Sequence, residues 1–291
     1  MAHPQIATFA RLAGEDAKPA RVIAGQTTLL SRTMHDIRYD PVNDELLVTN
    51  PFGNAILVFR GGANGEEPPI RVIQGPHTQL VGNTDRLDVD PINNEIYVPL
   101  RDAILVFPRD GNGDVAPLRV LRGPKTHMTS VSSVVVDTVR NRLVVGTYTF
   151  RDEEEEAATG NIPEGMNYGD PGGGGLLTFN RTDEGDVAPR TMIRGPKSGI
   201  WRINQIQVHA PKGWIVATQP GKNNVEEPEG IFVGVWGIDD TGDVPPRWKL
   251  AGPKSLIKKP RGVVLDPKHK EMIVADMRLN AVLTYYFPEI F

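Results

Sequence analysis

The chain has 291 residues, no cysteine, 30 glycines and 25 prolines. Hydrophobic residues make up 39% of it and charged residues 23%, which favours a packed core over a disordered chain. The absence of cysteine excludes disulfides and thiolate metal sites. With a net charge of −4 the sequence shows no basic footprint for nucleic acid. No apolar run approaches the ~18 residues that a membrane-spanning helix needs, so we expect no membrane association.

The first 22 residues, MAHPQIATFARLAGEDAKPARV, lack the apolar centre of a secretory signal. We therefore expect a cytoplasmic protein if the chain is full length. If a signal segment preceded the first residue, we expect an extracytoplasmic protein.

Three phrases recur in a fixed order along the chain. A phrase of the RVIQGP kind is followed by one of the IRYDPVNDELLVT kind and then by one of the AILVF kind. These short runs of β-branched and aromatic residues lie between turn residues, which predicts four hairpin-linked strands in each unit. No segment sustains a 3.6-residue period, which excludes a helical solenoid. The glycine of the first phrase is Gly25, Gly75, Gly123, Gly195 or Gly252 in the successive repeats.

In chain order, residues 5–25 supply two strands that resemble the third and fourth strands of a unit. Five first strands follow, and the 25 residues after the last of them leave room for a second and a third strand only. We predict an all-β, single-domain β-propeller over residues 1–291 with five four-stranded blades, closed by the N-terminal segment, which completes the C-terminal blade. The five first strands are predicted to end at Asp40, Asp90, Asp137, His209 and Asp266.

Two stretches of the sequence resemble a known repeat. LDVDPINNEIYVPLRDAILVF (87–107) and VVLDPKHKEMIVADMRLNAVLTYY (263–286) are similar to the strand–turn units of bacterial NHL-type and related propeller repeats. The resemblance covers nearly the whole chain, although NHL-type propellers usually have six blades. The wider superfamily includes protein- and RNA-binding modules, lactonases, lyases and sugar hydrolases, so the resemblance implies a fold and not a function.

Polar residues recur where each first strand begins, beside the expected propeller axis. The next aligned position is apolar in every unit (Ile37, Leu87, Val134, Ile206 and Val263), which predicts core. The polar positions are either a binding site or the lining of a hydrated channel. The candidates are His35, Asp36, Asp85, Arg86, Ser132, Asn204, Gln205 and Arg261.

Long loops at 150–174 and 219–230 interrupt the third and fourth units between their second and third strands. Loops of this length in a compact domain often carry binding residues and are otherwise solvated. We expect both loops on the same face as the polar positions. Arg151 and Tyr168 in the first loop, together with Trp201, are the candidate loop-side contacts.

The sequence favours a non-enzymatic binding or scaffold module, whose partner is another protein or a small polar ligand. Assembly into a homo-oligomer also stays open. The alternative is a lactonase-like or glycosidase-like hydrolase, with His35 or an aspartate as the base. Arg86 and Arg261 would then stabilise developing negative charge.

No cofactor is expected. His35, Asp36, Asp85 and Asn204 offer ligand atoms for a divalent cation on the axis, with or without hydrolytic chemistry. The positive charges of Arg86 and Arg261 at neighbouring positions argue against such a cation.

Overall fold

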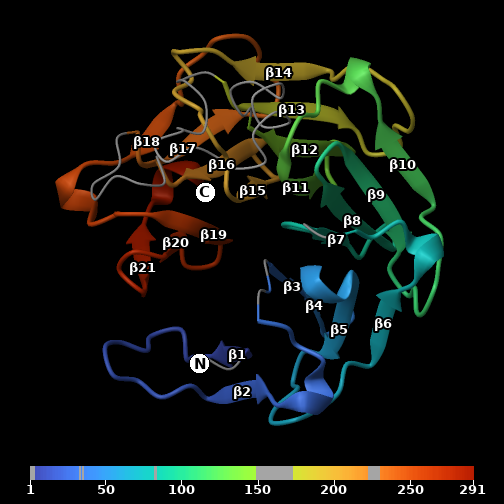
Figure 1. Ribbon diagram of the computed structural model, residues 1–291. Helices are drawn as coiled ribbons and strands as arrows, with labels where there is room; N and C mark the ends of the chain where they lie inside the picture. Colours follow the sequence, from blue (N-terminus) through green and yellow to red (C-terminus); the bar gives the residue numbers. More distant parts are fainter. Residues whose placement is uncertain (1–3, 33, 35, 82–83, 149–172, 222–229) are drawn as a thin grey trace, which may run out of the picture. The chain divides into compact units, whose positions relative to one another are not determined.

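Figure 1 shows the computed structural model, which describes residues 4–32, 34, 36–81, 84–148, 173–221 and 230–291. The chain divides into two compact units. Unit 1 holds residues 1–100 and 105–120, and unit 2 holds residues 101–104 and 121–291. Whether the two form one domain, as the sequence predicts, stays a prediction.

Unit 1 contains blades 1 and 2, each an antiparallel sheet whose strands follow chain order. Before them, β1 (Gln5–Thr8) pairs with β2 (Arg21–Ala24). Blade 1 consists of β3 (Ile37–Asp40), β4 (Glu45–Asn50), β5 (Ala55–Arg60) and β6 (Arg71–Gln74). Blade 2 consists of β7 (Asp88–Asp90), β8 (Glu95–Leu100), β9 (Ala103–Pro108) and β10 (Arg119–Arg122), of which the beginning of β9 and the end of β10 belong to unit 2.

Unit 2 contains blades 3, 4 and 5. Blade 3 consists of β11 (Val131–Asp137), β12 (Arg142–Thr147), β13 (Gly175–Asn180) and β14 (Thr191–Arg194). Blade 4 consists of β15 (Ile206–His209), β16 (Trp214–Gln219), β17 (Phe232–Gly237) and β18 (Trp248–Leu250). Blade 5 has three paired strands, β19 (Pro260–Asp266), β20 (Glu271–Asp276) and β21 (Ala281–Tyr286). Short 3-10 turns lie at Gln26–Thr28, Pro51–Gly53, Pro76–Thr78, Pro124–Thr126, Pro253–Ser255 and Pro288–Ile290.

The order of the strands confirms the predicted fold class, a β-propeller of five blades. The first strands β3, β7, β11, β15 and β19 end at the five residues that the sequence predicted. The N-terminal hairpin also has the predicted character: Ala7 lies opposite Val22, as Leu57 lies opposite Val72 in blade 1. β1 and β2 therefore hold the positions of a third and a fourth strand. Their pairing with blade 5 stays a prediction.

Consecutive blades within a unit are joined by a repeated contact. The fourth strand of one blade forms a parallel bridge with the glycine in the turn between the third and fourth strands of the next blade. In unit 1 this contact joins β2 to blade 1 and blade 1 to blade 2. The bridges in unit 1 are Ile23 with Gly65 and Ile73 with Gly113, and those in unit 2 are Leu121 with Gly185 and Ile193 with Gly242.

The apolar position of the first strands is buried in four blades, with Leu87, Val134, Ile206 and Val263 at most 3% exposed. The prediction is wrong for Ile37, which is 44% exposed. β3 is the first inner strand of unit 1, and the other inner strand of that unit, β7, contacts it on one side. One face of β3 in unit 1 is therefore open.

Candidate functional site

The predicted polar positions lie on a local irregularity at the start of the inner strands. In blade 3 the pairing passes from Val131 with Thr147 directly to Ser133 with Gly146, so Ser132 is an extra, bulged residue. In blade 5 the same shift leaves out Arg261, between Pro260 and Gly262. Bulges re-aim side chains and are frequent beside functional sites.

Blade 4 has the corresponding geometry just before β15. The Asn204 N–H donates to the Thr218 carbonyl oxygen at 2.9 Å, and the Gln205 N–H donates to Thr218 Oγ1 at 3.0 Å. Blade 1 repeats the second bond, from the Asp36 N–H to Thr49 Oγ1 at 2.9 Å. The alignment of the repeats therefore identified structurally equivalent positions.

Two of the predicted residues, together with Ser133, join neighbouring inner strands of unit 2. Ser132 Oγ donates to the Ile203 carbonyl oxygen at 2.6 Å. Ser133 Oγ accepts from the Ile206 N–H at 3.3 Å, and Gln205 Oε1 accepts from the Val263 N–H at 2.7 Å. These bonds satisfy buried backbone groups between blades 3, 4 and 5. Ser132 and Gln205 thus have a structural role that accounts for their polarity.

Asn204 differs from these two residues. Its side chain is 1% exposed, and neither Oδ1 nor Nδ2 has a hydrogen-bond partner among the residues that the structure describes. A buried amide without partners costs about 1–3 kcal/mol of folding free energy. The polarity of Asn204 is therefore not explained by the contacts that hold the described parts of the blades together.

A basic cluster, made of Arg202, Lys259, Arg261 and Arg278, lies in the same unit. The Lys259 side chain is buried, and burial lowers the pKa of its ammonium group, helped by the charges of Arg261, Arg278 and Arg202 in that order. We call these four residues the basic cluster because the charges of the three arginines act on the Lys259 ammonium group. Arg202, Lys259 and Arg278 were not predicted, although the sequence Lys258-Lys259-Pro260-Arg261 could have indicated a basic segment.

Asp276 fixes the backbone of this cluster. It is 2% exposed, and its Oδ2 accepts from the N–H groups of Lys258 and Lys259, each at 2.7 Å. Its Oδ1 accepts from the N–H of Arg278 at 3.0 Å. One carboxylate therefore holds together the chain segments that carry two of the cluster's side chains.

The predicted residues of unit 1 form a separate ionic group. Asp36 is 8% exposed, and burial raises the pKa of its carboxyl to about 6 against the opposing charges of Arg38 and Arg86. Arg38 Nε lies 3.5 Å from an oxygen of Asp36 and 3.5 Å from one of Asp88. Asp85 and Arg86 form an ion pair with each other. Arg38, which was not predicted, lies on β3, two residues after Asp36, which directly precedes that strand.

The loop-side candidates receive little support. Arg151 and Tyr168 lie outside the described residues, and so does His35. Trp201 is 7% exposed, its backbone N–H donates to Gln219 Oε1 at 2.6 Å, and its ring lies 3.4 Å from where a Cβ on Gly230 would stand. Trp201 therefore packs at the base of the blade-4 loop, and its role in binding stays a prediction.

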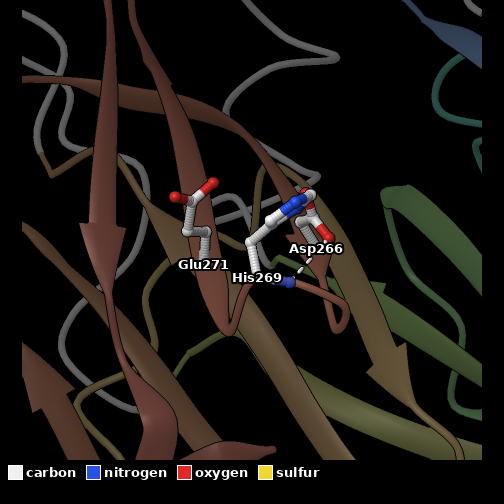
Figure 2. Close-up of side chains that lie close together, drawn as sticks. All are labelled: Asp266, His269 and Glu271. Atoms are coloured by element: carbon white, nitrogen blue, oxygen red, sulfur yellow. Dashed lines mark hydrogen bonds and ion pairs between the residues drawn. The ribbon is translucent and has the colours of Figure 1, made fainter. Parts of the chain in front are cut away.

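One group in the described part of the chain has the residue types and spacing of a metal site: Asp266, His269 and Glu271. Asp266 ends β19, His269 lies in the turn that follows, and Glu271 opens β20, so the group lies away from the predicted positions. His269 Nδ1 is 2.6 Å from Asp266 Oδ2, and Figure 2 shows the imidazole directed at Asp266 with the Glu271 carboxylate on the other side.

Blade 1 explains this arrangement without a metal. There Asp40 Oδ2 accepts from Asn43 Nδ2 at 2.7 Å, and Asp40 Oδ1 accepts from the Asn43 N–H at 3.1 Å. Asp266 and His269 hold the same two positions in blade 5, and the His269 N–H again donates to the aspartate at 3.2 Å. Asp266 and His269 therefore form a side-chain cap of a tight turn.

Comparison with known proteins gives no family for this chain: no protein-family model matches the sequence, and no curated protein matches it. No helix in the described ranges is long and apolar enough to cross a membrane. The function therefore has to be argued from the site itself.

Proposed function

We propose that this protein is a non-enzymatic binding module that takes a small polar ligand where the inner strands of blades 3, 4 and 5 begin. We also propose that the resemblance to NHL-type repeats reflects a similar fold and not a similar function. A propeller scaffold is compatible with a binding role, and the residues of unit 2 indicate where binding would occur.

The observation that carries the proposal is the buried, unpartnered amide of Asn204. The side chain of the equivalent bulged residue Ser132 bonds to a neighbouring blade, whereas the side-chain amide of Asn204 has no partner in the described residues. A buried polar group without a partner calls for an explanation, and a ligand that accepts from Nδ2 and donates to Oδ1 would provide one.

The test replaces Asn204 with leucine, which has a similar branched shape and no polar atoms. Because the amide is no longer buried unsatisfied, we expect Asn204→Leu to raise the free energy of unfolding by about 1–3 kcal/mol. In thermal melts with neutral sugars, amino acids, carboxylates and phosphates, we expect a compound that stabilises the wild type to lose its effect on this variant. Such a gain in stability with a loss of function is typical of binding sites.

Gln207 on β15 provides the matched control, because its Nε2 is also buried without a partner in the described residues. Gln207→Leu should leave the ligand response unchanged. The proposal fails if no compound of any class stabilises the wild type, or if the wild type and Asn204→Leu respond alike.

One observation favours the hydrolase alternative. The Asp36 carboxyl, whose pKa is raised to about 6, is tuned for acid–base catalysis near neutral pH. Turnover of lactones or aryl glycosides that depends on a group with a pKa near 6 and disappears in Asp36→Asn would support this candidate. Purified protein without such turnover would rule it out.

A further inference from the structure

We infer that the ligand of this site presents a primary amide or a lactam to Asn204, accepting a hydrogen bond from Nδ2 and donating one to Oδ1. This assignment rests on the proposed function and specifies the chemical class of its ligand. Two observations carry it. Both polar atoms of the Asn204 side chain are unsatisfied, and the polar groups on either side of Asn204 already bond within the blades.

The first observation is the state of the Asn204 amide. Its side chain is 1% exposed, and neither Nδ2 nor Oδ1 has a partner among the residues that the structure describes. Its backbone is held in place, because the Asn204 N–H donates to the Thr218 carbonyl oxygen at 2.9 Å. A ligand that reaches only one of the two side-chain atoms leaves the other buried and unsatisfied, which weakens binding. The ligand therefore needs a donor and an acceptor side by side.

The residues on either side of Asn204 are committed to the neighbouring blades. Ile203 packs against β12 of blade 3, where a Cβ added to Gly146 would stand 2.8 Å from Ile203 Cγ2. Gln205 contacts blade 5, because its Oε1 accepts from the Val263 N–H at 2.7 Å. Asn204 is therefore the member of this triplet whose side chain serves neither contact.

The hydroxyl groups near this triplet are also engaged. Ser132 Oγ donates to the Ile203 carbonyl oxygen at 2.6 Å, and Thr218 Oγ1 accepts from the Gln205 N–H at 3.0 Å. A ligand with many hydroxyl groups, such as a sugar, would need several polar side chains that are not already engaged. One amide paired with one amide is the simplest recognition that these contacts leave.

An amide is the group that matches both atoms of Asn204 at once. A carboxylate and a ketone accept hydrogen bonds but donate none, and a hydroxyl offers its donor and its acceptor on a single oxygen. A primary amide or a lactam holds an N–H and a C=O on the same side of a planar group. Two parallel hydrogen bonds can then form, as when asparagine reads adenine. An open-chain secondary amide does not match, because its trans form places the N–H and the C=O on opposite sides.

The experiment measures thermal melts of the full chain with acetamide, benzamide and pyrrolidone. Each amide is compared with counterparts of similar shape, which for benzamide are benzoate, acetophenone and N-methylbenzamide. We expect a bound amide to raise the melting temperature as its concentration rises. At least one of the three amides should bind at least about tenfold more tightly than all its counterparts, because each counterpart leaves one atom of Asn204 unpaired.

Asn204→Asp tests the pairing by exchange. An ionised carboxylate only accepts hydrogen bonds, so it matches an amidinium, which only donates them. We expect the wild type to prefer the amide over the amidinium of the same shape, such as benzamide over benzamidine, and Asn204→Asp to reverse the order. Asn204→Leu should respond to neither, which keeps the test decisive if the aspartate variant does not fold. Gln207→Leu is the matched control and should keep the wild-type order.

The outcomes separate the ligand class from the proposed function. If sugars or carboxylates stabilise the wild type through Asn204 and amides do not, the ligand class is wrong and the proposed function holds. If amides stabilise the wild type and Asn204→Leu alike, they bind elsewhere, and both are wrong. A folded Asn204→Asp that keeps the wild-type order would overturn the ligand class alone.

Discussion

At the scale of single residues, Asp36 should make stability depend on pH. Its carboxyl has an ordinary pKa of 3.8 and a folded-state pKa of about 6, so the folded protein binds the proton more tightly. The stabilisation is fully present below pH 3.8 and is lost as the pH rises to 6. A shift of this size corresponds to about 3 kcal/mol.

We therefore expect Asp36→Asn to be less sensitive than the wild type to a rise from pH 4 to pH 7. Chemical denaturation at several pH values in this range gives the free energy of unfolding of both proteins. The difference between the two values at each pH removes the contribution of the other carboxylates. Asp239→Asn, at an exposed position in a turn of blade 4, serves as the control. Parallel curves for the wild type and Asp36→Asn would show that the Asp36 pKa is not raised.

At the scale of elements, the blades are joined by a carboxylate at a repeated position. Asp186, in the turn between β13 and β14, accepts from the Lys125 N–H at 2.7 Å, just after β10. Asp243 accepts from the Lys197 N–H at the same distance, just after β14. These contacts accompany the parallel bridges and fix how successive blades meet within unit 2.

We predict that Asp186→Ala lowers the free energy of unfolding by about 1 kcal/mol, because the Lys125 N–H loses its acceptor. Gly123→Ala should cost more, about 2 kcal/mol or above, since Gly123 has φ +142° and an added Cβ would meet the Asp186 carboxylate. Urea denaturation measures both changes. The free energy of unfolding of the exposed control Asp239→Ala should fall within about 0.5 kcal/mol of the wild-type value. An equally small change in Asp186→Ala would contradict a stabilising role of the bond between Asp186 and the Lys125 N–H.

The elements also show what the sequence could predict. The ends of the inner strands were readable because an aspartate followed by turn residues marks four of them, and the repeat supplies the fifth at His209. The bulges were not readable, since Ser132 and Arg261 look like ordinary strand residues until the register shift is seen. The distinction between Gln205, which bonds the next blade, and Asn204, which does not, depends on partners distant in sequence.

At the scale of the whole molecule, the completion of blade 5 by the N-terminal segment stays a prediction, and the repeat itself suggests how to test it. In blades 1 and 2 the second strand opens with a glutamate that pairs with the arginine opening the fourth strand. Glu45 and Arg71 lie 2.7 Å apart, and Glu95 and Arg119 lie 2.8 Å apart. In blade 4 two tryptophans hold these positions, with ring centroids 5.2 Å apart.

Blade 5 opens its second strand with Glu271 and has no fourth strand of its own, whereas β2 opens with Arg21. If β2 serves as that fourth strand, Arg21 takes the position of Arg71 relative to Glu271. We expect Arg21→Glu and Glu271→Arg each to destabilise the protein. The double variant should be more stable than the sum of the two single effects predicts, by at least about 0.5 kcal/mol, because smaller departures from additivity also occur between independent sites.

Urea denaturation of the four proteins completes the cycle, because opposite charges are restored in the double variant and like charges oppose each other in both single variants. Arg21→Glu combined with Glu289→Arg, at an exposed position near the C-terminus, supplies the additive control. Additivity in the Arg21–Glu271 cycle as well would mean that β2 does not complete blade 5, and that the hairpin of β1 and β2 ends the series of blades in unit 1 without joining the last sheet of unit 2.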